Sequence, residues 1–193
     1  MTTKTIDGGL RNKGNVALGI DQSLTGFALT ALSCDTPTEF LTWVYKSPYF
    51  GIERLVDIRE WLVDHFMWLE EQDFDVVNIA MEGTVLASHA ALVLGELSAT
   101  VRLAIYDHYE DELRFPLKVP PMTLKKYASG KGNAKKQEML LQIYKRWGVE
   151  FTNDNAADSY ALARLASGSA DGAIEKAIIE QMSDPKYRDQ PAI

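Results

Sequence analysis

The sequence has little of what marks membrane, exported or disulfide-bonded proteins. Cys34 is the only cysteine in 193 residues, so an intramolecular disulfide is impossible and a reducing cytoplasm is expected. No apolar run reaches the length of about 18 residues that a membrane-spanning helix needs. Residues 1–14 lack the apolar segment of a signal peptide, so none is expected.

Several catalytic signatures are also missing. The histidines His65, His89 and His108 are scattered, so no cluster of histidine and cysteine ligands for a metal is expected. Gly130-Lys131-Gly132 lacks the spacing of a P-loop. No second strand-and-hairpin unit with an aspartate follows the first, which disfavours a sugar-kinase or actin-like ATPase. There are no internal repeats and no low-complexity segments.

The residues that are present predict one globular domain with a mixed α/β fold. Apolar residues make up 46% of the chain and charged residues 24%, which is ordinary for a globular protein. We expect a flexible tail over 1–14, a domain over 15–167 and a C-terminal tail over 168–193 with one short helix. Periodicity predicts five strands, at 15–21, 26–33, 40–46, 75–81 and 115–119. It also predicts helices at 51–71, 87–109, 133–147, 153–166 and 170–182. The order predicts a five-stranded sheet with helices on both faces, and a glycine-bearing basic loop over 122–136.

Two carboxylates directly follow apolar strands. Asp21 ends the run NVALGID, and Glu82 ends the run DVVNIAME. If the two strands are parallel neighbours, both side chains emerge at the same sheet edge, where ligand sites of open α/β sheets lie. For Asp21 alone, the alternative is a turn residue that bonds to nearby backbone.

A third acidic group comes from the segment DNAADSYALA. Asp154 and Asp158 are one helical turn apart, so they share a face. Helix capping by Asn153 or Asp154 explains the first acid but not the second. Together these acids supply hard oxygen ligands, for which Mg²⁺ is the expected ion and Mn²⁺ a substitute. Two such ions about 3.5–4 Å apart can activate water for phosphodiester cleavage.

Charge is segregated along the chain. The net charge is −7, but residues 117–147 carry +7 and the remainder −14. A basic segment of this kind is the electrostatic footprint of a polyanion, and the alternative is a solvated helix face. The lysines assigned to DNA binding are Lys125, Lys126, Lys131, Lys135 and Lys136.

The long helix predicted over 87–109 carries two patterns. Its larger apolar residues form a stripe that is typical of core packing. Its small residues would let another backbone approach closely, either in the core or at a subunit interface. These small residues are Ala90, Ala91, Gly95, Ser98 and Ala99.

Four segments in one order resemble the ribonuclease H-like superfamily, and most closely the RuvC-type Holliday junction resolvases, especially phage versions. The segments are LGIDQSLTGFAL, IAMEGTVLASHAALVLGELSATV, TLKKYASGKGNAKKQEM and DNAADSYALA. The resemblance covers about residues 15–166. It implies metal-dependent cleavage of four-way DNA junctions by a homodimer in a bacterial or phage-infected cytoplasm. Two alternatives are a nuclease for flaps or RNA–DNA hybrids and a catalytically silent junction-binding protein.

The resemblance also assigns residues. Asp21, Glu82 and Asp158 match the catalytic acids of the family, and Lys125 and Lys136 match lysines that contact DNA. The last family motif reads D-A-A-D, whereas this chain has Asn155 at its first position and Asp154 one residue earlier. We therefore expect Asp154 to be the fourth catalytic and metal-binding residue, with Asn155 as the other candidate. Val85 stands where the bacterial enzyme has an aromatic residue.

Overall fold

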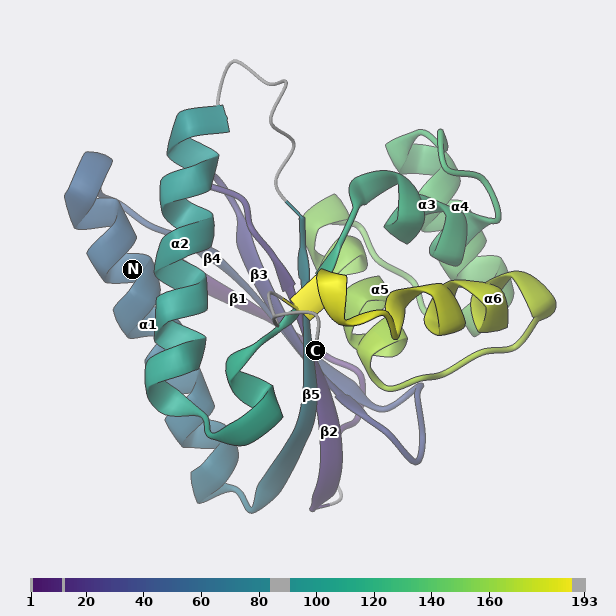
Figure 1. Cartoon of the computed structure of the whole chain (residues 1–193), viewed down its shortest axis with the longest axis horizontal. Coiled ribbons are helices and arrows are strands. Elements are labelled where there is room, and N and C mark those ends of the chain that lie inside the picture. Colours follow the sequence, from purple (N-terminus) through teal and green to yellow (C-terminus); the bar gives the residue numbers. More distant parts are fainter. Residues whose placement is uncertain (1, 12, 84–90, 189–193) are drawn as a thin grey trace.

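A computed structural model describes residues 2–11, 13–83 and 91–188, which form one mixed sheet between two layers of helices (Figure 1). The strands are β1 (Thr2–Asp7), β2 (Gly14–Asp21), β3 (Phe27–Ser33), β4 (Phe40–Lys46), β5 (Phe74–Glu82) and β6 (Leu117–Val119). The α-helices are α1 (Gly51–Glu71), α2 (Ala91–His108), α3 (Pro121–Ser129), α4 (Lys136–Trp147), α5 (Asp154–Ala166) and α6 (Ala173–Met182). Short 3₁₀ helices span Asp111–Arg114 and Pro185–Arg188.

The sheet order is β1-β4-β3-β2-β5-β6. β2, β3 and β4 form the predicted antiparallel meander, and β5 pairs parallel with β2. Because Ile20 pairs with Met81, Asp21 and Glu82 follow at the same level on neighbouring strands. The expected placement of both acids at one sheet edge is therefore confirmed.

Two apolar cores cover the two faces of the sheet. Val16, Leu18 and Ile20 of β2 join the core under α1 and α2, whereas Ala17 joins the core under α3, α4, α5 and α6. This alternation follows from the two-residue period of a strand. In Figure 1, α1 and α2 lie on one side of the sheet and α3–α6 on the other, as predicted for helices on both faces.

The close approach of α5 to β2 depends on Gly19. A Cβ atom at Gly19 would lie 2.0 Å from the carbonyl oxygen of Ser159 and 2.3 Å from the amide nitrogen of Ala163. No larger residue fits without moving the helix backbone. Gly19 thus lets the first turns of α5, with their acidic residues, lie directly over the strand that ends in Asp21.

The predicted flexible tail over 1–14 and the count of five strands are wrong for the described residues. Thr2–Asp7 form a sixth strand, β1, which pairs antiparallel with β4 and is itself the edge strand of the sheet. The hydroxyl of Thr3 accepts a hydrogen bond from the Trp61 indole at 3.1 Å, and Leu10 is buried in the α1–α2 core. A polar strand at a sheet edge has one solvated face, so hydrophobic periodicity does not detect it.

The predicted basic loop over 122–136 is also partly wrong. Residues 121–129 form α3, in which Pro121 occupies the first turn, where a missing N–H costs nothing. Gly130 ends this helix in a left-handed conformation with φ of 81°. Leu124, Tyr127 and Ala128 are buried, so packing of this face stabilises a helix too short to form alone.

The predicted short helix near the C-terminus is present as α6, but it is no loose tail. Ile178 and Met182 are 3% and 2% exposed and belong to the core under α3–α6. Among the described residues, no helix is both long and apolar enough to cross a membrane.

Candidate active site

The acidic residues predicted to act together come from three elements that meet at one edge of the sheet. Asp21 ends β2 and Glu82 ends the parallel neighbour β5. Asp154 and Asp158 lie in the first two turns of α5, which Gly19 brings onto β2. Parallel strands about 4.8 Å apart hold the first two carboxylates close together.

Helix capping at α5 is performed by Asn153 rather than by Asp154. The Asn153 side chain accepts a hydrogen bond from the Ala156 amide at 2.9 Å, which satisfies one of the free donors of the first turn. Asp154 is therefore the first residue of the helix, and its carboxylate is left for the site.

These acids line one cavity of about 370 Å³. The lining includes the four predicted acids, Asn155, and two of the five predicted lysines, Lys125 and Lys136. The other lining residues are Gln22, Ser23, Leu24, Leu94, Pro121, Met139, Leu140 and Ala157. The cavity therefore combines acidic oxygen donors with two cations, over an apolar wall.

Three predicted lysines lie outside this cavity lining. Lys126 is exposed on α3, next to Lys125. Lys131 forms an ion pair with Glu138 at 2.9 Å, and Lys135 is the N-cap residue of α4. They border the same basic segment but do not face the acids in the way that Lys125 and Lys136 do.

Mutual repulsion and burial favour the protonated forms of the deepest acids. Burial raises the pKa of Asp21 well above its ordinary value, and the neighbouring carboxylates, first Asp158, raise it further. Burial, followed by the charge of Glu82, raises the pKa of Asp158 to about 7. Burial also raises the pKa of Glu82, against which the positive charge of Lys125 acts. A bound cation would relieve this repulsion.

Asp154 differs from the other three acids. It forms an ion pair with Lys136, and this hydrogen bond lowers the pKa of Asp154 below its ordinary value. The same contact raises the pKa of Lys136. Asp154 is therefore the most readily charged acid of the cavity, and Lys136 is held at its rim.

Asn155 also lines the cavity, and its amide lies against the turn between β2 and β3. A Cβ atom at Gly26 would lie 2.4 Å from the Asn155 side-chain nitrogen, so a larger residue there would displace the Asn155 amide. Asn155 can offer a neutral oxygen, whereas Asp154 can offer a charged one. Both candidates for the fourth metal-binding residue, Asp154 and Asn155, therefore line the cavity.

The donor set fits a hard divalent cation, because it consists of carboxylate oxygens around one cavity. Within residues 2–11, 13–83 and 91–188, however, no three acidic, histidine or cysteine side chains already form a metal-binding group.

Gln22 is a cavity residue that the sequence reasoning missed. Its amide nitrogen donates to the main-chain oxygen of Glu82 at 2.6 Å, which ties the ends of β2 and β5 together. Its buried side-chain oxygen has no hydrogen-bond partner among the described residues. A glutamine in a turn is not by itself a signal of such a contact, so only its position directly after Asp21 could have indicated it.

Two predictions near this edge concern residues outside the described part of the chain. Val85, at the position of a family aromatic residue, and His89 both lie within 84–90. Of the other histidines, His65 contacts the Trp61 carbonyl and His108 pairs with Glu70. Neither lines the cavity.

Comparison with known proteins identifies the fold. No family model and no curated protein matches the sequence. A Thermus thermophilus RuvC structure superposes with a TM-score of 0.60 at 20% identity, covering 87% of this chain and 96% of that one. The structure of T. thermophilus RuvC in complex with Holliday junction substrate gives a TM-score of 0.59 at 19% identity over the same shares. These likenesses confirm the predicted ribonuclease H-like α/β fold.

The raised pKa of Asp158 predicts a pH-dependent stability. Unfolded aspartate loses its proton near pH 3.9, whereas folded Asp158 keeps it up to about 7. The folded state therefore gains stability from the neutral carboxyl of Asp158. This contribution is fully present below about pH 4 and is lost progressively as the pH rises from 4 through about 7. Asp158→Asn cannot ionise, so we expect it to exceed the wild type at pH 8 by roughly 2–4 kcal/mol in unfolding free energy.

This difference is measured by urea denaturation in EDTA at pH 5 and at pH 8. Asp75→Asn, which removes an exposed carboxylate at the opposite end of β5, is the control. A gain from Asp158→Asn that is equal at both pH values would contradict the prediction.

Proposed function

We propose that this chain is a metal-dependent endonuclease that cleaves four-way DNA junctions by paired symmetric nicks. The observation that carries the proposal is the cavity at the ends of β2 and β5, which Asp21, Glu82, Asp154 and Asp158 line together with two lysines. The fold supports it, because the similar T. thermophilus protein has been solved in complex with a Holliday junction substrate.

In this proposal Asp21, Glu82, Asp158 and Asp154, or Asn155 in its place, hold Mg²⁺, for which Mn²⁺ can substitute. Divalent ions there would activate water and stabilise the leaving oxygen of the phosphodiester. Lys125 and Lys136 bind phosphates beside the acids, and Lys126, Lys131 and Lys135 extend the basic surface. Such contacts position the DNA without reading its sequence.

Two symmetric nicks require two sites, so we propose a homodimer with two-fold symmetry.

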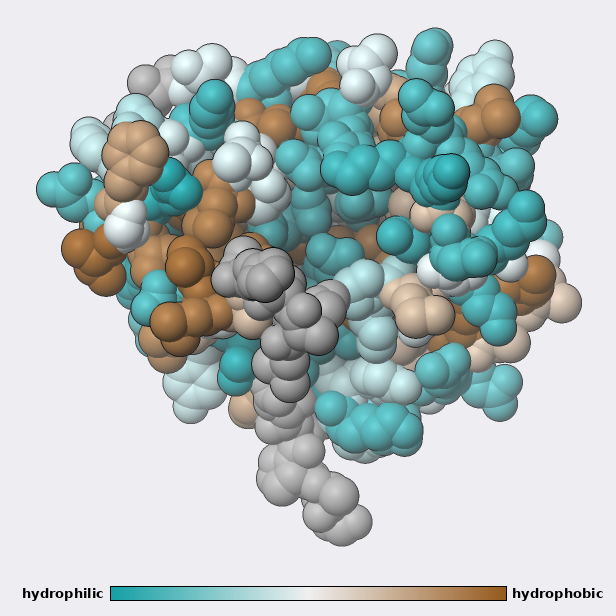
Figure 2. Space-filling model, turned by 90° about the horizontal axis from the view of Figure 1, so that it is seen from above, coloured by the Kyte–Doolittle hydropathy of each residue, from teal (hydrophilic) through white to brown (hydrophobic). Residues whose placement is uncertain are grey.

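The small residues of α2 lie on different faces of the helix. Ser98 is buried in the monomer, whereas Ala99 belongs to an outward-facing apolar row. Leu92, Leu103 and Tyr106 of this row are 78%, 58% and 46% exposed. Figure 2 shows apolar residues gathered mainly on the α1–α2 side and hydrophilic residues mainly on the α3–α4 side. Exposed apolar rows of this kind mark interaction surfaces, and we assign the α2 row to subunit contact.

The direct experiment incubates the protein with labelled four-way junction, flap, duplex and RNA–DNA hybrid, in Mg²⁺, in Mn²⁺ and in EDTA. We expect paired nicks in the junction with either metal and none in EDTA. Preference for a flap or hybrid would replace the junction assignment with another ribonuclease H-like nuclease. Tight junction binding without cleavage in either metal would identify a silent binding protein.

The cavity lysines are expected to make the strongest phosphate contacts. Lys125→Ala and Lys136→Ala should each weaken junction binding regardless of sequence, and each should reduce the slope of log affinity against log salt by about 0.9. The other three lysines should give smaller effects, because they do not line the cavity. Fluorescence anisotropy over a salt series in Ca²⁺ measures both quantities.

Lys13→Ala provides the matched control for the salt series. Lys13 precedes β2 at the end opposite Asp21, where it pairs with Asp73. Its loss should leave the slope unchanged. An unchanged slope for Lys125→Ala as well would mean that the basic segment is a solvated face.

The identity of the fourth acidic position is open to a simple comparison. We expect Asp154→Asn to slow cleavage more than Asn155→Ala, because only Asp154 supplies a negative charge. Junction cleavage rates of the two variants at saturating Mg²⁺ decide this. The reverse order would assign the position to Asn155 and leave Asp154 as the partner of Lys136.

A further inference from the structure

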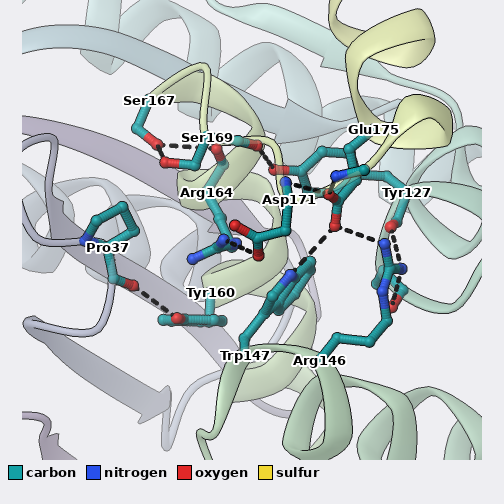
Figure 3. A network of polar contacts seen from close by, with 12 residues as sticks. Pro37, Tyr127, Arg146, Trp147, Tyr160, Arg164, Ser167, Ser169, Asp171 and Glu175 are labelled. Atoms are coloured by element: carbon teal, nitrogen blue, oxygen red, sulfur yellow. Dashed lines mark hydrogen bonds and ion pairs between the residues drawn. The ribbon is translucent and has the colours of Figure 1, made fainter.

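The C-terminal segment around α6 carries a buried carboxylate that the proposed reaction does not use. Glu175 is fully buried, and all its hydrogen bonds come from within the chain. One of its oxygens accepts from the Arg146 guanidinium at 2.6 Å and from the Trp147 indole at 3.2 Å. The other accepts from the main-chain amides of Asp171, at 2.5 Å, and Gly172, at 2.8 Å. Figure 3 shows Glu175 between the chain before α6 and the side chains of α4.

Arg146 carries this contact on to a third helix. Its Nη2 atom binds Glu175, and its other terminal nitrogen, Nη1, donates to the carbonyl oxygens of Tyr127 and Ala128, both at 2.8 Å. These carbonyls belong to the last turn of α3, where helix carbonyls lack partners within the helix. The Tyr127 hydroxyl also donates to the Ser169 carbonyl at 2.5 Å (Figure 3). Residues 169–175 are thus bound to α3 both directly and through Arg146.

The helices joined in this way are the two that bring lysines to the acidic cavity. Lys125 lies on α3, one helical turn or less from the carbonyls that Arg146 binds. Lys136 is the first residue of α4, and Arg146 lies in the last turn of the same helix. Because α3 has only nine residues, a shift of its last turn moves Lys125 relative to Glu82 and Asp158.

We propose that Arg146 and Glu175 are positioning residues, which fix α3 against α4 and so hold Lys125 at the phosphate-binding rim of the cavity. The proposal rests on the proposed function for its DNA-binding consequence, but not for the mechanical link itself. It gives the segment from Ser169 to Met182 a role in substrate binding.

Arginine is required at position 146 because one planar group must donate both to the Glu175 carboxylate of α6 and to two main-chain carbonyls of α3. Lysine at this position keeps the charge and can pair with Glu175, but a single ammonium cannot also reach both carbonyls in the same geometry. Arg146→Lys is thus the milder variant. Glu175→Gln is the more severe variant, because the amide has one acceptor oxygen where the carboxylate has two, and its NH2 group would face two of the four donors.

The first experiment needs no DNA. Amide hydrogen exchange of Arg146→Lys and of Glu175→Gln is compared with the wild type. We expect faster exchange in residues 124–129 of α3 and unchanged exchange in β2 and β5. Unchanged exchange in α3 for both variants overturns the proposal. Arg59→Lys, in an ion-paired arginine on α1 across the sheet, is the matched control and should leave α3 unchanged.

The second experiment is a double-mutant cycle on junction binding in Ca²⁺, with Lys125→Ala, Arg146→Lys and the double variant. If Arg146 acts through Lys125, Arg146→Lys weakens binding about fivefold when Lys125 is present and has no further effect in Lys125→Ala, a coupling of about 1 kcal/mol. A purely structural defect gives additive losses, and that result overturns the proposal.

The two experiments distinguish failure of the proposed function from failure of the positioning role of Arg146 and Glu175. If the wild type binds no branched DNA, the proposed function fails, and the assignment of Lys125 to substrate fails with it. The exchange measurement still decides whether Arg146 and Glu175 fix α3. If the wild type cleaves junctions but the losses are additive, the proposed function stands and the positioning role is rejected.

Discussion

Asp21→Asn is expected to lower the rate of junction cleavage by about a thousandfold or more while junction binding is kept. Asp21 ends a central strand, pairs with Ala28 of β3 and is 4% exposed, so backbone pairing sets its position in the cavity. Loss of one charged ligand removes several kcal/mol of charge stabilisation from the transition state, and about 4 kcal/mol corresponds to a thousandfold.

The same substitution should not harm the fold. Burial and neighbouring acids raise the pKa of Asp21, which means that the folded protein disfavours its charged form. A neutral amide of the same size removes this penalty and leaves core volume unchanged. Junction affinity should be kept, because Asp21 offers the phosphates no favourable contact that the substitution could remove.

Single-turnover cleavage and binding in Ca²⁺ measure the two effects of Asp21→Asn. Asp75→Asn makes the same chemical change at an exposed position at the opposite end of β5. It should retain the wild-type rate. Near-wild-type turnover of Asp21→Asn in Mg²⁺ would remove Asp21 from the site, and equal losses in both variants would indicate a general effect on the protein.

The second large effect is expected at the outward row of α2. Leu103→Arg places a charge in the middle of this row, where 58% of the side chain is exposed, so the monomer fold should persist. In a two-fold interface the same row of each subunit contacts the other subunit. One substitution therefore places two arginines in the interface. We expect a folded monomer that no longer makes paired, symmetric nicks.

Sedimentation and circular dichroism measure the association state and the fold, and a cruciform plasmid reports paired against single nicks. Val56→Arg, at a 48% exposed apolar position on α1, is the matched control and should remain dimeric. A bulky residue at Gly95 tests the original small-residue hypothesis, because a Cβ atom there meets nothing within 4 Å in the monomer. A wild-type protein that is monomeric and keeps its full rate on every substrate would reject the paired-nick proposal and leave the metal site intact.

The placement of the acids was predictable because it depends on local patterns. Apolar runs determine where β2 and β5 end, and Asp21 and Glu82 are the residues directly after the apolar positions. A spacing of four residues places Asp154 and Asp158 on one face of any helix. The helix 51–71 and the strand 40–46 were predicted to the residue, because their periodicity is strong and uninterrupted.

Other features depend on contacts between distant segments, which local patterns do not contain. β1 is polar and forms only because the edge of β4 is free to pair with it. α3 is short and basic, and buried contacts of Leu124 and Tyr127 stabilise it as a helix.

By itself, therefore, the sequence determined the fold class, the strand ends and the acids that follow them, since each depends on hydrophobic periodicity within one segment. Only the tertiary structure decided which cations face those acids and what holds them there. Lys125 and Lys136 line the cavity because α3 and α4 pack over α5. Arg146 joins α3 to Glu175, which lies 29 residues after Arg146 in the chain. Such contacts depend on the packing of whole helices, for which no residue spacing within one segment is a signal.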